Sequence, residues 1–389
     1  MKKIVSLGVL ITGLLLSVLP VFADNYADDS EMRAYYNEKM TKRDYTVEKA
    51  VIQKIVFDDT KEVRKDVPLE ADIRYQHLQI QILTGKYQGK RMTIRHTIER
   101  IMPGNYVFRE GEKIILRVTE EDGKISTVKI EEKARDTQLF IIIGLFCVLM
   151  GVFAGVKGLK ALLTLVITLG LILFAYIPLI IHHRDPVLSS VGISIVSVVI
   201  TLFILSGRNR KTYAAIVGTS AGVIIAGILA YVFGEFTLLT GLSDGDAISL
   251  AYIPEFRNLD YKGLLFGTML IGAVGAVMDV AVSIASALWE IQEKTENISR
   301  KEMLVSGMTI GKDILGSMAN TLILAYVGTT LHLIILFVVY NVYIREIINL
   351  DSIATEIVRA MAGSIGLIAT IPVTVFISTW IYGKKEKTR

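Results

Sequence analysis

The chain has 389 residues, 52% of them hydrophobic, a mean hydropathy of +0.50 and a formal net charge of +4 at pH 7. This apolar balance exceeds that of soluble domains and indicates a protein that lives mainly in a membrane. The basic residues fall in short clusters between apolar runs, which argues against a nucleic-acid partner. Cys147 is the single cysteine, so neither an intramolecular disulfide nor a cysteine-based metal site can form.

Residues 1–23 have the pattern of a signal peptide or signal anchor. Lys2 and Lys3 precede a long apolar run, and Val21 and Ala23 suit cleavage before residue 24. An uncleaved anchor is the alternative reading. Both readings place the following segment outside the cytoplasm.

Residues 24–136 are polar and predict one extracytoplasmic, β-rich domain. Apolar and polar residues alternate in the segments 78–82, 92–95 and 114–118, as in strands with one buried face. Asp122 and Gly123 favour a tight hairpin before the run 125–130. With the segment 46–57 this makes about five short strands, so we expect a small all-β domain, an OB-like barrel or a sandwich.

Two features of this domain leave alternatives open. Residues 31–42 form either a helix or a disordered lead-in. A basic set provides either a surface for anionic lipid heads or wall polymers, or simply a solvated strand face. Its members are Arg91, Arg95, His96, Arg100 and Arg109.

Residues 137–383 predict a polytopic α-helical membrane bundle of about seven spans, followed by a basic tail, 384–389. Each apolar run is near or above the roughly 20 residues that a helix needs to cross a bilayer. The runs are 139–156, 159–181, 187–206, 213–233, 264–289, 314–336 and 357–381. Lys and Arg concentrate in alternate loops, which predicts a cell-membrane protein with a cytoplasmic C-terminus.

Two segments are less regular than this count. The run 314–344 is longer than one span requires, and we expect one span with an interfacial extension, or a break near Gly328. Ser243 with Asp246 fits a capping box for a short helix that ends before Pro254.

An aspartate in the middle of an apolar run marks the most informative segment, 268–290. Small and polar residues there recur at spacings of three and four, which places them on one face of a helix: Thr268, Gly272, Gly275, Asp279, Ser283, Ser286 and Glu290. A charged side chain at a helix centre costs about 2.5–3.5 kcal/mol on insertion scales. Pairing, a bound cation, water or protonation must therefore offset the charge of Asp279.

Two further spans carry similar stripes. Asp313, Ser317 and Asn320 share one face, with Thr321 beside them, and the last span carries a stripe that begins at Arg359. We expect the stripes to face one another, so that Asp279 meets Asn320 near mid-membrane. The transport candidates are therefore Asp279, Ser283, Ser286, Asn320, Thr321 and Asp313. The alternative is that these residues only lock helices together.

Motifs of enzymes are not found in the sequence. It has no HExxH pattern and no P-loop, so we expect no enzyme activity, no catalytic residue, no metal and no cofactor.

The strings IGAVGAVMDVAVSIASALWE at 271–290 and GKDILGSMANTLILAYVG at 311–328 resemble the YibE/F family of bacterial multi-pass membrane proteins. The resemblance covers the membrane region and is weaker over the β-rich domain. It implies an integral membrane protein and brings no established substrate, catalytic residue or cofactor.

Together these features favour a proton- or cation-linked transporter or permease. Its expected partners are the lipid bilayer and a small solute or cation. The alternative is a membrane scaffold or sensor whose outer β domain binds an envelope component or a partner protein.

Overall fold

The computed structural model describes residues 45–60, 72–99, 106–121, 124–295 and 298–382. The predicted signal segment 1–23, the segment 31–42 and the basic tail 384–389 lie outside these ranges. The chain divides into two compact units, Met1–Phe146 and Cys147–Arg389.

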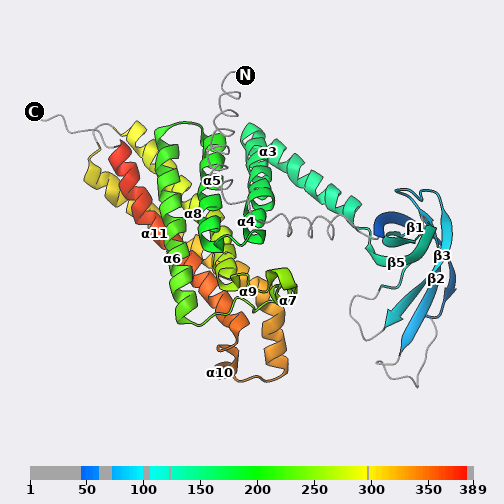
Figure 1. Ribbon diagram of the computed structural model, residues 1–389. Coiled ribbons are helices and arrows are strands. Elements are labelled where there is room, and N and C mark those ends of the chain that lie inside the picture. Colours follow the sequence, from blue (N-terminus) through cyan, green and yellow to red (C-terminus); the bar gives the residue numbers. More distant parts are fainter. Residues whose placement is uncertain (1–44, 61–71, 100–105, 122–123, 296–297, 383–389) are drawn as a thin grey trace, which may run out of the picture. The chain divides into compact units, whose positions relative to one another are not determined.

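The first unit is a five-stranded antiparallel sheet in the order β3-β2-β1-β4-β5 (Figure 1). Its strands are β1 Tyr45–Asp58, β2 Ile73–Ile82, β3 Arg91–Glu99, β4 Lys113–Glu121 and β5 Lys124–Lys133. The two edge strands, β3 and β5, also approach each other, so the sheet is a nearly closed barrel. The predicted all-β domain of five strands is confirmed. The neighbour order around the barrel is that of an OB-like fold.

Alternation along the strands places the apolar side chains inside the barrel, since neighbouring residues of a strand point to opposite faces. In β2, Leu78, Ile80 and Ile82 are fully buried, while Gln79 and Gln81 between them are partly exposed. Strand β1 pairs with both β2 and β4, and two irregularities in its pairing with β2 let this long strand bend.

The helices that are long and apolar enough to cross a membrane belong to the second unit, except that residues 136–146, the start of the first helix, belong to the first unit. Among the described residues there are six such stretches: Asp136–Ile181, α5 Pro186–Ser206, α6 Arg210–Phe236, α8 Tyr261–Lys294, α9 Arg300–Val339 and α11 Asp351–Tyr382. The first consists of α3 Asp136–Leu171, the π-helical turn Ile172–Tyr176 and α4 Ile177–Ile181. This stretch contains two of the seven predicted runs, 139–156 and 159–181. Near the boundary between them the chain bends at Gly155, where the backbone leaves helical geometry (φ 55°, ψ −136°). The predicted helical membrane bundle is confirmed.

The structure bears on two of the predicted connections. Helix α9 continues through Gly328 without a break, and the short α10 Ile344–Ile347 follows it. The N-cap of α7 Gly245–Ala251 is Asp244, not Ser243, because the Asp244 carboxylate reaches the backbone N–H of Asp246 at 3.4 Å. The 3₁₀ turn Pro254–Phe256 comes after α7.

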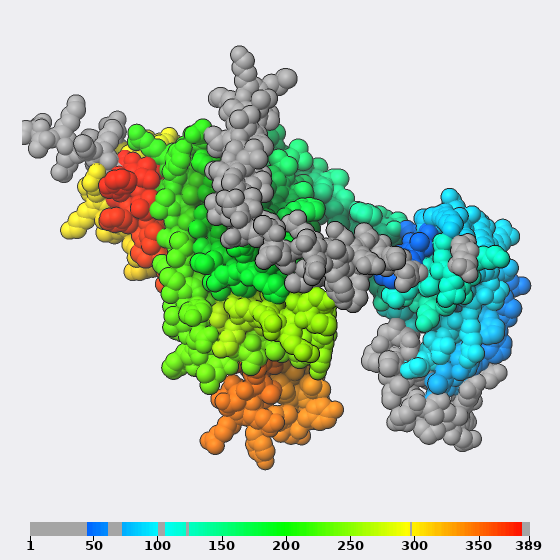
Figure 2. Space-filling model, viewed as in Figure 1, coloured from blue at the N-terminus to red at the C-terminus, as the bar shows by residue number. Residues whose placement is uncertain are grey.

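Helices α5, α6, α8 and α11 form the core of the second unit, whereas α3 and α9 expose most of their apolar surface. Small residues allow close packing of α6 on α11: Gly218 lies against Thr374 and Gly222 against Thr370. Figures 1 and 2 show α6, in green, beside the red end of α11.

Contacts between helix ends show which loops share one end of the second unit. At one end, the Gln292 side chain donates to the carbonyl of Tyr382, whose hydroxyl donates to the carbonyl of Ala285 at 3.2 Å. At the other end, the Thr240 hydroxyl donates to Asp351 at 2.6 Å. Because α6 runs antiparallel to α11, the loop 207–209 lies at the first of these ends, as do Thr295, Ile298 and Ser299 between α8 and α9.

Candidate functional site

The polar stripe of α8 points away from the core of the second unit. Val277, Val280 and Ile284 are fully buried on the opposite face of the helix. On the stripe, Asp279 and Ser283 are exposed, and Ser286 is half-buried. The 3.6-residue period thus separates an apolar face, which packs, from a polar face, which does not. Within the described ranges the Asp279 carboxylate makes no hydrogen bond or ion pair.

Helix α9 brings its polar residues to the same depth as Asp279. Gly307 of α9 lies against Leu288 of α8, and Gly311 lies against Ile284, so the two helices run antiparallel in a defined register. By this register Gly316 is level with Asp279. Asp313 and Asn320 then lie about one turn to either side.

The transport candidates on α9 lie at exposed positions of that helix. Asp313, Asn320 and Thr321 are all exposed, and the Thr321 hydroxyl donates within its own helix, to the carbonyl of Ser317, at 2.8 Å. In the part of the chain that the structure describes, no hydrogen bond or ion pair joins Asp279 to any of the other five candidates. A meeting of Asp279 and Asn320 therefore stays a prediction.

The stripe of α11 packs against other helices. Its Gly366 is buried against Ala226 of α6, and its Thr370 is buried against Gly222. Arg359 forms an ion pair with Glu356 of the same helix at 2.8 Å. Gly366 and Thr370 therefore pack α11 on α6, whereas a Cβ at Gly363 would lie near Leu322 of α9 and Ala273 of α8.

A cavity of about 270 Å³ lies between α3, α5 and α8. Helix α3 and its π-helical turn contribute the residues Ala161, Thr164, Leu165, Thr168 and Ile172; α5 contributes Ile193, Ser194, Ser197, Val198 and Thr201; α8 contributes Ile271, Val274, Gly275 and Met278. All of these lining residues are uncharged, and five of them carry hydroxyl groups. The cavity thus offers hydrogen-bonding groups on an otherwise apolar wall.

The hydroxyl groups of the cavity wall differ in their hydrogen bonding. Thr168 and Ser197 share a hydrogen bond of 2.8 Å, and the Thr164 hydroxyl donates to the carbonyl of Ala161 at 2.8 Å. The Ser194 hydroxyl is buried and has no hydrogen-bond partner among the described residues. A buried polar group left unsatisfied costs about 1–3 kcal/mol. This wall therefore favours a polar guest, either water or a solute.

Asp279 is not one of the residues that line this cavity, but it lies close to two of them along α8. Gly275 both lines the cavity and belongs to the polar stripe, and Asp279 follows it by one turn on the same face. Met278, the residue before Asp279, also lines the cavity. The fold thus places an ionisable group beside a hydroxyl-lined space. Nowhere in the described ranges do three His, Cys, Asp or Glu side chains gather as a metal site requires.

The cavity hydroxyls of α3 and α5 were not predicted from the sequence. Their signal is the spacing of Ser190, Ser194, Ser197 and Thr201, which are four, three and four residues apart and so lie on one face of α5. Single Ser and Thr residues are common in membrane helices, so only the repeated spacing distinguishes this face.

The residues of the basic set in the first unit differ in their exposure. Arg91, Arg95 and Arg109 are exposed, and the Arg95 guanidinium stacks 3.9 Å from the centre of the Tyr75 ring. His96 is half-buried, with its Nε2 2.8 Å from the carbonyl oxygen of Tyr106, and burial lowers the pKa of this imidazole. Arg100 lies outside the described residues.

Comparison with known families covers both units. The family model described as YibE/F-like protein matches residues 142–384, and the model described as YibE/F family N-terminal domain matches residues 44–133. No curated protein and no solved structure matches the chain. The two family models account for most of the sequence, including the barrel and the helices around Asp279, and the chain therefore belongs to the YibE/F family.

Proposed function

We propose that this protein is a proton- or cation-linked transporter of the cell membrane, in which Asp279 handles the ion and the hydroxyl-lined cavity admits a small polar solute. One observation carries the proposal. An unpaired carboxylate stands near the middle of a 34-residue apolar helix, one turn from a cavity with five hydroxyl-bearing residues. Ser283, Ser286, Asn320, Thr321 and Asp313 are proposed to line the ion path.

The negative charge of the Asp279 carboxylate is costly inside a membrane. A carboxylate at the centre of a membrane helix is stable only if water, a cation or a proton compensates it. A group that exchanges between these states can bind an ion on one side of a membrane and release it on the other. The cavity contains no charged lining residue, so it suits an uncharged polar solute or a file of water molecules.

The arrangement of the loops supports an orientation. The basic cluster 208–211 and the basic residues Lys294, Arg300 and Lys301 lie at the same end of the second unit, where α11 also ends. Basic loops concentrate on the cytoplasmic side. We therefore propose that this end is cytoplasmic and that the β barrel is extracytoplasmic.

The test is ion flux through the purified full chain in proteoliposomes. A membrane potential drives protons or sodium ions inward, and a trapped dye reports their arrival. We expect Asp279→Asn to abolish the flux and Asp279→Glu to retain part of it. Glu293→Gln is the matched control, because Glu293 is an exposed acid at the end of the same helix. Flux through Asp279→Asn equal to that of the wild type, or wild-type flux no greater than that of empty vesicles, would refute transport.

A second candidate function is that of a scaffold or sensor. The barrel exposes about half of the Phe57 side chain, next to His77 in an edge-to-face contact at 5.4 Å. Exposed aromatic side chains favour contact with an envelope component or a partner protein. In that case Asp279→Asn would change assembly of the protein and no ion flux would be measured.

A further inference from the structure

We propose that a basic hollow at one end of the β barrel binds the phosphate of an anionic phospholipid in the membrane leaflet that α3 enters. The hollow has a volume of about 350 Å³. It is formed by residues 111–113, at the start of β4, and by residues 133–135 with Thr137 and Gln138, where β5 passes into α3. This proposal is independent of ion transport.

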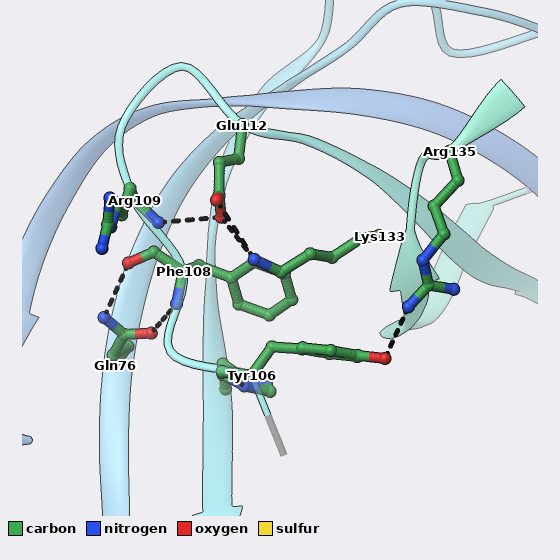
Figure 3. A network of polar contacts seen from close by, with 8 residues as sticks. Gln76, Tyr106, Phe108, Arg109, Glu112, Lys133 and Arg135 are labelled. Atoms are coloured by element: carbon green, nitrogen blue, oxygen red, sulfur yellow. Dashed lines mark hydrogen bonds and ion pairs between the residues drawn. The ribbon is translucent and has the colours of Figure 1, made fainter. Parts of the chain in front are cut away.

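The acidic group of the hollow is already neutralised (Figure 3). Both oxygens of Glu112 accept hydrogen bonds from Lys133 Nζ, at 3.1 and 3.2 Å, and one of them also accepts from the backbone N–H of Arg109 at 3.0 Å. The Lys133 ammonium also lies 5.3 Å from the centre of the Tyr106 ring. Glu112 therefore holds Lys133 in place without repelling an incoming anion strongly.

Two further cations face the hollow. The Arg135 side chain is about half exposed, and its guanidinium donates to the Tyr106 hydroxyl at 2.5 Å (Figure 3). It also donates to Glu132 at 3.1 Å. These bonds orient the guanidinium and leave other N–H groups of its planar fork for phosphate oxygens. Lys113 is exposed and has no side-chain partner among the described residues.

The carboxylate nearest to the start of α3 is also paired. Asp136, the first residue of the helix, forms an ion pair with Lys49. Glu112, Glu132 and Asp136 are thus each paired with a base, and the residues that line the hollow carry three cations and one acid. The surface therefore attracts anions.

The apolar start of α3, directly after the hollow, indicates that the phosphate belongs to a lipid. The side chains that follow the hollow in α3 are apolar and exposed, among them Leu139 (54%), Phe140 (70%) and Ile141 (65%). An exposed apolar helical run enters the hydrocarbon of a bilayer, so the residues directly before it lie at the depth of the headgroups. Tyr106, with an apolar ring and a polar tip, suits the same layer. A lipid phosphate is therefore the expected occupant.

The experiment uses the full chain in vesicles with a fluorescent reporter at the hollow. Cys147→Ser removes the native thiol, and Gln138→Cys carries an environment-sensitive dye. Emission is compared between phosphatidylcholine vesicles and phosphatidylcholine vesicles that contain phosphatidylglycerol. We expect a spectral shift with phosphatidylglycerol that weakens as salt is added.

The variant Lys113→Gln with Arg135→Gln should lose this shift. The matched control, Lys124→Gln with Lys129→Gln, removes the same charge from exposed positions of β5 outside the hollow and should keep the shift. Lys113→Gln alone should reduce the shift, and it breaks no side-chain contact among the described residues. An unchanged shift in the double variant would overturn the proposal. An equal shift produced by inorganic phosphate in phosphatidylcholine vesicles would also overturn it, because the hollow would then bind free phosphate.

Discussion

The close contact of α6 and α11 makes Gly222→Ala a sharp test of the packing of the second unit. A Cβ atom at residue 222 would lie 1.8 Å from the Thr370 hydroxyl oxygen and 2.7 Å from a methyl carbon of Val277. An ordinary contact needs at least 3.4 Å, so the helices or the Thr370 side chain must move by roughly 1.5 Å. Thr370 is fully buried and donates to the carbonyl of Gly366 at 2.8 Å.

Both ways of making room are costly. If the extra methyl group pushes the helices apart, the interface is overpacked, which costs about 1–3 kcal/mol. Rotating Thr370 leaves a buried hydroxyl unsatisfied, which costs about 1–3 kcal/mol. Alanine in place of glycine stabilises the helix itself by about 0.5–1 kcal/mol, because alanine has the higher helix propensity. We therefore expect Gly222→Ala to lower the free energy of unfolding by about 1–2 kcal/mol.

Denaturation in mixed micelles of a mild detergent and dodecyl sulfate measures this free energy. Gly192→Ala is the control, because a Cβ at Gly192 of α5 would meet no atom within 4 Å. It should leave stability unchanged or raise it by about 0.5–1 kcal/mol. Equal effects of the two substitutions would refute the packing of α6 on α11.

Two other predictions concern pH and orientation. Burial lowers the pKa of His96 in the folded barrel below its usual 6.5. As the pH falls below 6.5, the unfolded state therefore binds more protons than the folded state. The free energy of unfolding should then fall as the pH drops through the pKa of the folded state. Calorimetric melting temperatures between pH 7 and pH 5 should fall less in His96→Gln, and an equal fall in both proteins would contradict this. The orientation can be tested in intact cells with variants that also carry Cys147→Ser. A maleimide that does not cross the membrane should label Asp246→Cys from outside but should not label Arg300→Cys. The reverse labelling would contradict the proposed topology.

The strands could be predicted because each has one buried face. Leu78, Ile80 and Ile82 alternate with polar residues, and this alternation survives in the barrel. The choice between a barrel and a sandwich could not be made from the pattern, because it depends on β3 approaching β5, a contact between distant segments.

For the helices, too, local features could be predicted from the sequence, whereas features that depend on tertiary contacts could not. Their apolar length is plain in the sequence, but the bend at Gly155 is not, and α3 continues as a helix through Lys157 and Lys160, where the sequence suggests a loop. Asp279 could be found because a charge in an apolar run is costly. The hydroxyl of Ser194 could not, because the sequence does not show which neighbours surround it.

Water access to the face of α8 that carries Asp279 tests the central claim most directly. Gly275 lines the cavity, and a Cβ there would meet no atom within 4 Å, so Gly275→Cys should fold normally. Its rate of modification by a small, charged thiol reagent reports water, because the reactive thiolate does not form in hydrocarbon. The control is Val166→Cys, at an exposed apolar position of α3 outside the cavity lining. The account predicts fast modification at position 275 and slow modification at position 166, and equally slow modification at both would contradict it.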